Sequence, residues 1–122
     1  RVFGQGEWIR DYVYIDDVID AICRVALAAD GTLHHRIYNV ATQTPSSLVK
    51  VAQLIVENTQ SLLGKHIPIV FESKDLPPIE TRNYVGSHLR LTQDTGWQPT
   101  IPLEEGISRL LRAETKMPGK WV

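Results

Sequence analysis

The hydrophobic and polar positions change their spacing near residue 16. From Trp8 to Ile15 they alternate, which predicts an extended strand with two different faces. One face is apolar and holds Ile9, Val13 and Ile15, and the other holds Trp8, Arg10, Tyr12 and Tyr14. The strand therefore places one cation, Arg10, among aromatic neighbours and just ahead of two aspartates, Asp16 and Asp17.

Helical spacing follows this strand. Apolar residues recur at steps of three and four, at Val18, Ile22, Val25 and Ala29, joined by Ile19, Cys23 and Ala26. The pattern predicts a helix with one buried apolar face. We expect Asp16 to cap its N-terminus, Asp17 to add negative charge to the first turn, and Gly31 to close it.

The rest of the chain alternates between short strands and helices. Strands are predicted over 36–42 and 67–73, and helices from Ser46 or Ser47 to Gly64, over 88–95 with Ser87 as cap, and from Pro102 onward. This order is typical of an α/β fold with a mixed or partly parallel sheet. Trp97, at the turn after Gly96, is expected to anchor the core.

Composition and charge narrow the class of protein. The chain has 122 residues, the size of a single domain, and 43% of them are hydrophobic, as in ordinary globular chains. A net charge of −1 provides no field to hold nucleic acid or a membrane surface, and no apolar run approaches the ~20 residues that span a bilayer. The single cysteine, Cys23, excludes an internal disulfide, and we expect a cytoplasmic protein in which this thiol is buried and inert.

Several catalytic patterns are absent. Gly4 and Gly6 match the first two glycines of G-x-G-x-x-G, but Ile9 stands at the third position and no helix follows. No tyrosine has a lysine four residues on, and the histidines lack metal-site spacing. The adjacent His34 and His35 are expected in a solvated loop. We therefore predict no catalytic, cofactor-binding or metal-binding residue within this chain.

Two arginines are the candidates for binding. Arg10 is either an ordinary strand arginine stacked on Tyr12 or Trp8, or an anion clamp, because a guanidinium binds phosphate oxygens bidentately and keeps its charge. Arg82, after a proline-rich loop, is likewise either an exposed charge or a phosphate ligand. Asp16 and Asp17 could form a pair for acid–base chemistry, but their place at a strand-to-helix junction favours capping.

Four stretches of the sequence carry a family resemblance. They are VFGQGEWIRDYVYIDDVIDAI, IYNVATQTPSSLVKVAQLI, PPIETRNYVGSHLRLTQDTGWQP and IPLEEGISRLL. In this order they resemble the C-terminal part of the extended short-chain dehydrogenase/reductases that act on nucleotide sugars, the NAD-dependent epimerases and dehydratases. The resemblance implies that residues 1–122 are one substrate-binding portion of a Rossmann-type enzyme, with short strands and about four helices.

The resemblance also implies roles for residues. In such enzymes the arginine of the RD-aromatic segment and the arginine after the proline-rich loop meet the diphosphate of a nucleotide sugar. By motif position these are Arg10 and Arg82. The family's glycine-rich NAD(P) loop and its Tyr-x-x-x-Lys pair lie upstream of the matched part. The chain alone is therefore not expected to run hydride chemistry or to bind NAD(P) tightly, and its partner would be the N-terminal Rossmann half.

Three positions depart from the family pattern. Gly86 stands where an aspartate is common, Glu80 replaces an aspartate, and Thr95 precedes Gly96 where a leucine is usual. These departures affect the expected contacts of residues 80–90 more than the expected fold.

Two interpretations of the whole chain remain. Because it begins at Arg1, inside a segment that reads as structured, we expect a fragment of a nucleotide-sugar epimerase or dehydratase. The alternative is a free-standing, non-catalytic α/β module for ligand binding or protein interaction. Within the enzyme class, 4-epimerase, 4,6-dehydratase and keto-sugar reductase stay open, as do NAD or NADP and a homodimer.

Overall fold

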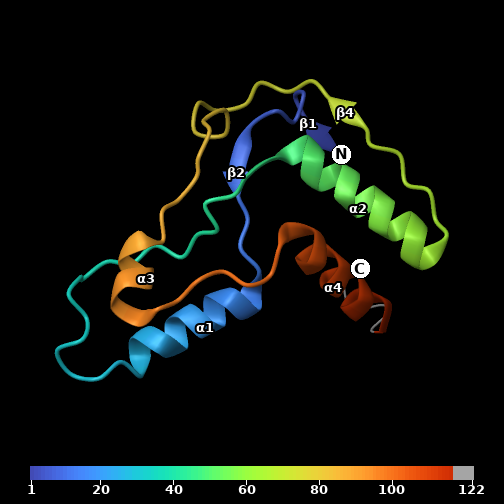
Figure 1. Cartoon of the computed structure of the whole chain (residues 1–122). Helices are drawn as coiled ribbons and strands as arrows, with labels where there is room; N and C mark the ends of the chain where they lie inside the picture. The colour runs from blue at the N-terminus through green and yellow to red at the C-terminus, as the bar shows by residue number, and fades with distance from the viewer. Residues whose placement is uncertain (117–122) are drawn as a thin grey trace. The chain divides into compact units, whose positions relative to one another are not determined.

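The computed structural model describes residues 1–116, which form four helices and four short strands (Figure 1). The predicted α/β mixture of short strands and about four helices is confirmed. These residues divide into two compact units. Unit 1 contains residues 1–8 and 47–82 together with α4, and unit 2 contains residues 9–46 and 83–102.

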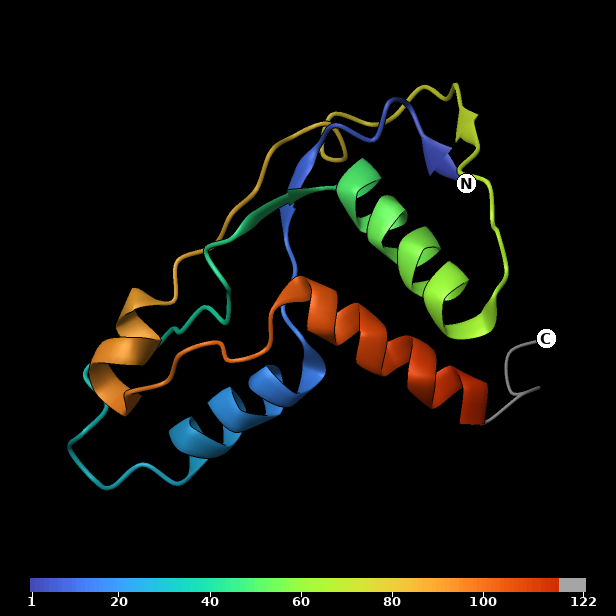
Figure 2. The ribbon, with the colours of Figure 1, turned by 45° about the vertical axis from the view of Figure 1, so that its right-hand side comes forward.

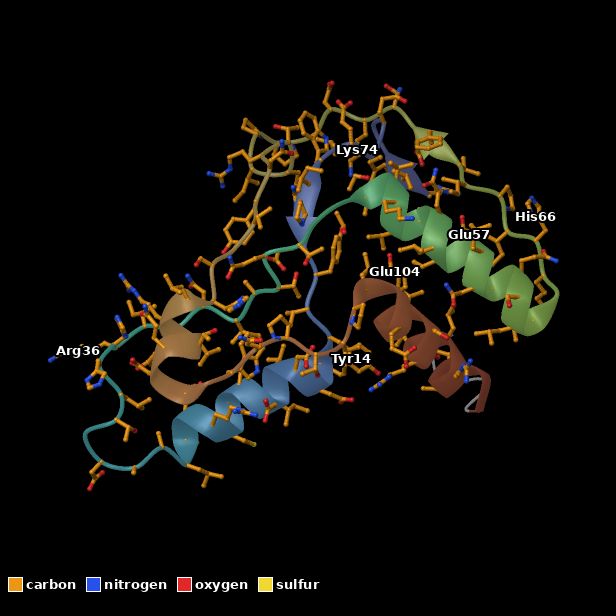
Figure 3. The ribbon with its side chains drawn as sticks, viewed as in Figure 1. Tyr14, Arg36, Glu57, His66, Lys74 and Glu104 are labelled. Carbon is orange, nitrogen blue, oxygen red and sulfur yellow. The ribbon has the colours of Figure 1, made fainter. Side chains whose placement is uncertain are left out.

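Unit 1 combines a pair of strands with two helices. β1 (Val2–Phe3) and β4 (Phe71–Glu72) pair in parallel and lie side by side in both views (Figures 1 and 2). α2 (Leu48–Leu63) packs against α4 (Leu103–Lys116). At one end of the strand pair the ammonium of Lys74 lies 4.5 Å from the ring centre of Phe3 (Figure 3).

The ends of α2 lie where the sequence predicts them. The hydroxyl oxygen of Ser47 accepts a hydrogen bond from the backbone N–H of Lys50 at 3.2 Å, so Ser47 is the N-cap. Gly64 follows the last turn with φ of 64°, a left-handed conformation that glycine adopts without strain.

Unit 2 has little regular strand structure. β2 (Ile9–Asp11) pairs with β3 (Pro45–Ser47), whose last residue already belongs to unit 1. α1 (Ile15–Ala26) packs against the short helix α3 (Leu89–Thr95). The core consists of Ala21, Leu91 and Trp97, with Val25, Tyr38 and Val40 packed against it. Trp97 is 0% exposed, so its predicted role as a core anchor is confirmed.

α1 differs from its prediction in position and in orientation. It begins at Ile15 and ends at Ala26, so Asp16 is inside its first turn, the N-cap position is Tyr14 and Gly31 lies beyond its end. Ile22 and Cys23 are exposed, and the predicted buried thiol is wrong. The reason is that the side of α1 holding Asp17 and Ala21, rather than its isoleucines, is buried in unit 2.

The strands are shorter than the alternating patterns. Only Ile9–Asp11 of residues 8–15 and Phe71–Glu72 of residues 67–73 form strands, and 36–42 belongs to no strand within residues 1–116. Alternation of side chains shows that a segment is extended, whereas a strand also needs a neighbour for its backbone hydrogen bonds. At α3 the N-cap position is His88 rather than Ser87, and Gly96 closes the helix with φ of 68°, as predicted.

Asp17 anchors the chain that follows α3. Its side chain is buried. One carboxylate oxygen accepts hydrogen bonds from the N–H of Thr100 at 3.1 Å and from its hydroxyl at 2.7 Å. The other oxygen accepts a hydrogen bond from the N–H of Ile101 at 3.0 Å. Its backbone carbonyl accepts from the indole N–H of Trp97 at 3.0 Å. Asp17 lies in the first turn of α1, as predicted, but it does not cap the helix. Its carboxylate instead binds a segment far along the chain.

Replacing Asp17 by asparagine tests this anchor. An amide has one acceptor oxygen instead of two, so at least one of the three donors from Thr100 and Ile101 loses its partner in a buried place. We expect Asp17→Asn to lower the free energy of unfolding by about 1–3 kcal/mol in urea titrations. The matched control is Asp16→Asn, at an exposed position of the same turn, expected to change it by less than about 0.5 kcal/mol. Equal effects of the two changes would contradict the anchor.

Candidate functional site

Arg10 lies on β2 in unit 2 and is partly buried. Its Nη1 donates a hydrogen bond to the carbonyl of Ile9 at 2.8 Å. Burial raises the pKa of the Tyr12 hydroxyl, and the positive charge of Arg10 opposes that shift. Arg10 and Tyr12 are therefore electrostatic neighbours, as the alternating pattern predicts.

Asp11, the next residue, joins β2 to two distant segments. One carboxylate oxygen accepts from the N–H and the hydroxyl of Thr42 at 2.8 and 2.6 Å. The other accepts from the N–H of Gln43 at 3.0 Å and from the N–H of Gly86 at 3.1 Å. Both oxygens of this carboxylate are thus occupied by donors that lie far from Asp11 along the chain.

The segment after the proline-rich loop runs beside β2. The N–H of Ile9 donates to the side-chain oxygen of Asn83 at 2.9 Å, and the N–H of Tyr84 donates to the carbonyl of Ile9 at 3.0 Å. Gly86 is buried, and a Cβ atom there would lie 2.6 Å from the Cβ of Ala41. The departure from the family pattern at Gly86 therefore has a physical reason, since a side chain would clash where the chain passes Ala41.

Gln43 has φ of 59°, the one positive value among the non-glycine residues that the structure describes. A side chain disfavours this conformation, which persists where surrounding contacts impose it. Here the contact is the hydrogen bond from its N–H to Asp11. The loop 42–44 is thus held in a fixed shape next to the strand that carries Arg10.

Arg82 is exposed and belongs to unit 1. It follows a turn in which the N–H of Glu80 donates to the carbonyl of Pro77 at 2.8 Å and the hydroxyl of Thr81 to that of Pro78 at 3.0 Å. In the chain it immediately precedes Asn83, the residue bonded to Ile9. The two predicted ligands therefore belong to different units.

The two histidines of the predicted solvated loop contact a buried carboxylate. Asp94 on α3, whose side chain is 2% exposed, accepts from the Tyr38 hydroxyl at 2.6 Å and from the backbone N–H groups of His34 and His35 at 2.7 and 3.2 Å. The Nδ1 of His35 lies 2.9 Å from the same oxygen. The prediction of a solvated loop is therefore wrong for His35 and for the backbone of His34.

This cluster shifts the acidity of its members. The hydrogen bond from Tyr38, with further bonds from His35 and His34, holds the pKa of the Asp94 carboxyl well below its usual range, against the opposing effect of burial. Burial, and then the hydrogen bond to Asp94, raise the pKa of the Tyr38 hydroxyl. The carboxylate of Asp94 is therefore a structural charge rather than a proton carrier near neutral pH.

Gly6, the second glycine near the N-terminus, is closely packed against its neighbours. A Cβ atom at Gly6 would lie 2.7 Å from a side-chain carbon of Val2 and 3.1 Å from the backbone nitrogen of Val49. The Gly6 carbonyl accepts from the N–H of Val49 at 2.8 Å. Gly6 therefore serves the packing of β1 on α2. A pyrophosphate loop instead needs open backbone N–H groups at a helix N-terminus.

Two features were searched for in the described part of the chain, metal-ligand clusters and membrane-spanning helices. Within residues 1–116 no group of three or more His, Cys, Asp or Glu side chains is arranged to hold a metal ion. No helix of that part has the length and apolar character needed to cross a bilayer.

The comparisons with known proteins point to one family. The model of the NAD dependent epimerase/dehydratase family matches residues 1–41. A dTDP-4-dehydro-6-deoxyglucose reductase of Escherichia coli is 31% identical over 115 residues, which are 92% of this chain and 33% of the relative. A UDP-glucose 4-epimerase of Mycolicibacterium smegmatis is 29% identical over 89% of this chain and 32% of its own length.

A solved structure agrees with these relatives. The UDP-glucose 4-epimerase of Thermotoga maritima with UDP-glucose superposes with a TM-score of 0.78 at 26% identity, over 94% of this chain and 34% of that one. The predicted resemblance to NAD-dependent nucleotide-sugar epimerases, dehydratases and reductases is thus confirmed, as is the α/β fold class. The chain spans about a third of the length of the relatives it matches.

Sequence reasoning missed the residues that shape this region. Asp11, Asn83 and Asp94 received no role, although each accepts hydrogen bonds from segments far along the chain. For Asp11 a signal existed, because it is the second residue of the quoted RD segment. Asp94 and Asn83 carry no local signal, since their partners are brought to them only by the fold.

Asp11→Asn tests the junction beside Arg10. Because an amide cannot accept the four hydrogen bonds that the carboxylate receives, we expect the free energy of unfolding to fall by about 1–3 kcal/mol. Thr42→Val removes a hydroxyl that donates to Asp11 at 2.6 Å and accepts from the N–H of Thr44 at 3.1 Å, and it should cost less, about 0.5–1.5 kcal/mol. Urea titrations of both variants decide this, and a larger loss for Thr42→Val would show that the carboxylate is not the centre of the junction.

The Asp94 cluster predicts an acid-dependent loss of stability. The pKa of Asp94 is lowered in the folded state, so its contribution is present above the unfolded value of about 4 and is lost as the pH falls below it. We expect the free energy of unfolding to decrease between about pH 5 and about pH 3, and to decrease less in Tyr38→Phe. His34→Ala is the control, because His34 contributes its backbone N–H and should keep the wild-type slope. Equal slopes for wild type and Tyr38→Phe would contradict the assignment.

Proposed function

We propose that this chain is the portion of an NAD(P)-dependent nucleotide-sugar epimerase or dehydratase that binds the diphosphate of the substrate. Arg10 and Arg82 are its diphosphate ligands, and the chain does not catalyse the reaction alone. The parent enzyme is an isomerase or a related enzyme of the cytoplasm. A dinucleotide-binding domain outside residues 1–122 supplies the cofactor and the catalytic tyrosine and lysine.

The observation that carries this proposal is the arrangement around β2. Arg10 lies next to Asp11, whose carboxylate holds Thr42, Gln43 and Gly86. A binding residue needs such rigid surroundings, because a guanidinium that is already positioned loses less entropy when an anion arrives. The comparison with a UDP-glucose 4-epimerase structure with UDP-glucose supports a ligand of this class.

The position of Arg82 in the sequence supports its role as a diphosphate ligand. It precedes Asn83, which accepts a hydrogen bond from Ile9, and Ile9 precedes Arg10. Each arginine is therefore the chain neighbour of one member of a hydrogen-bonded pair. Two guanidinium groups suit a diphosphate, since each forms charge-assisted, bidentate hydrogen bonds with phosphate oxygens.

The cofactor is not part of the chemistry of this chain. Gly4 and Gly6 come nearest to a dinucleotide fingerprint, but its third glycine is replaced by Ile9 and Gly6 is packed against Val2 and Val49. The residues of this chain bind and orient the substrate.

Arginine substitutions test the proposal. By isothermal titration calorimetry, UDP-glucose should bind at least about tenfold more weakly to Arg10→Ala and to Arg82→Ala, a loss of about 1.4 kcal/mol or more in each case. The control is Arg36→Ala, an exposed arginine on the loop after α1 that projects from the chain in Figure 3. Its variant should bind as the wild type does.

Other outcomes are equally clear. Unchanged affinity of Arg82→Ala removes that residue from the site, and an equal loss in Arg36→Ala shows a diffuse charge effect instead of a site. If wild type binds neither UDP-glucose, dTDP-glucose nor a GDP-sugar, the binding function is wrong for this chain.

A further inference from the structure

A hollow of about 500 Å³ opens in unit 2 where α1, the loop after it and α3 meet (Figures 1 and 2). Small-ligand sites in proteins measure about 300–1,000 Å³, so this hollow has room for a small molecule. The residues from α1 and its C-cap are spaced by three and four, so they share one side of the helix. The lining includes Asp20, Cys23, Arg24 and Leu27 from this side, Ala28 from the loop and Asp94 from α3.

One oxygen of the Asp94 carboxylate faces this hollow. The contacts with Tyr38, His34 and His35 are all made by Oδ2. Within residues 1–116 no group donates to Oδ1, although the side chain is only 2% exposed. No fully buried side-chain oxygen or nitrogen of that part of the chain lacks a partner, so Oδ1 reaches open space, and the hollow is the space that Asp94 lines. A ligand that donates a hydrogen bond to this oxygen would satisfy a nearly buried charged acceptor.

The charged groups that line the hollow favour a cation. They are the carboxylates of Asp20 and Asp94 and the guanidinium of Arg24. Arg24 donates from Nε to Asp20 at 2.8 Å and from Nη1 to the carbonyl of Thr95 at 3.4 Å. Its charge is therefore paired with Asp20. Asp94, whose lowered pKa keeps it ionised near neutral pH, has no cation of its own among the lining residues.

We propose that this hollow binds a small molecule with a primary ammonium group. The ammonium donates to Oδ1 of Asp94, and a short hydrocarbon stem lies against Leu27, Ala28 and Cys23. A phosphate or carboxylate group would instead meet two carboxylates. Neither proposed diphosphate ligand lines the hollow, so this site goes beyond the proposed function and does not depend on it.

The thiol of Cys23 reports on occupancy, because it lines the hollow and is the single cysteine of the chain. Its rate of reaction with dithiodipyridine, a neutral thiol reagent, is measured near neutral pH and at constant ionic strength as butylammonium chloride is added to the 122-residue chain. The control ligand is n-butanol, which has the same hydrocarbon stem and no charge. We expect butylammonium to protect the thiol with a Kd at least about tenfold lower than that of n-butanol, because only the ammonium forms a charge-assisted hydrogen bond with Asp94.

Two substitutions change the charge of the lining in opposite directions. Asp20→Asn removes a carboxylate and should raise the Kd of butylammonium about threefold, whereas Arg24→Gln removes the competing cation and should lower it about threefold. Asp30→Asn is the matched control, since Asp30 is exposed on the loop after α1 and does not line the hollow. Its Kd should equal that of the wild type. A general loosening of unit 2 would not produce shifts of opposite sign.

Asp94→Asn tests the acceptor itself. The amide keeps the size of the side chain and removes its charge, so we expect the Kd of butylammonium to rise at least about tenfold. Thermal unfolding shows whether this variant is folded. If it is not, the opposite shifts of Asp20→Asn and Arg24→Gln decide the question.

Three results would overturn the proposal. The first is a thiol whose reaction rate does not respond to butylammonium. The second is equal protection by butylammonium and n-butanol, which would make the hollow an apolar surface without a cation site. The third is a Kd that changes in the same direction, or not at all, in Asp20→Asn and Arg24→Gln.

Discussion

Unit 2 depends on buried or partly buried carboxylates that accept hydrogen bonds from backbone N–H groups in distant parts of the chain. Asp11 binds the segments around Thr42 and Gly86, Asp17 binds Thr100 and Ile101, and Asp94 binds the segment His34–His35. The unit has only one short strand pair among its described residues, so sheet hydrogen bonds satisfy few of its backbone groups. A carboxylate accepts several charge-assisted hydrogen bonds at once. In unit 2, three carboxylates hold the loops in the way that sheet hydrogen bonds hold strands.

One of these carboxylates, Asp11, links the stability of unit 2 to the candidate binding site. Asp11 follows Arg10 directly in the chain. Its carboxylate accepts a hydrogen bond from the N–H of Gln43, the residue with a positive φ in the loop 42–44. The position of the cation and the shape of the loop are consequently set by the same group. A change that loosens Asp11 alters both, whereas the Asp94 cluster, on α3, stabilises unit 2 through contacts of its own.

The apolar surface of α1 has a related meaning. Its buried side consists of Asp17 and Ala21, a small residue and a carboxylate, while its isoleucines are exposed. Trp97 explains the small residue, since Ala21 belongs to the same core cluster as this large ring. The polar anchors hold unit 2 together from within, and the larger hydrophobic side chains of α1, its isoleucines, are exposed.

Local sequence patterns were enough for some features and not for others. The ends of α2 at Ser47 and Gly64, the end of α3 at Gly96, the burial of Trp97 and the family resemblance all follow from short stretches, because caps, glycine conformations and motifs depend on near neighbours.

The partners of Asp11, Asp17 and Asp94, the exposure of Cys23 and the missing strand at 36–42 depend on contacts between residues far apart in the chain. Periodicity showed that α1 is amphipathic, but only tertiary packing decided which side of it is buried, because Ala21 meets Leu91 and Trp97, which lie far along the chain.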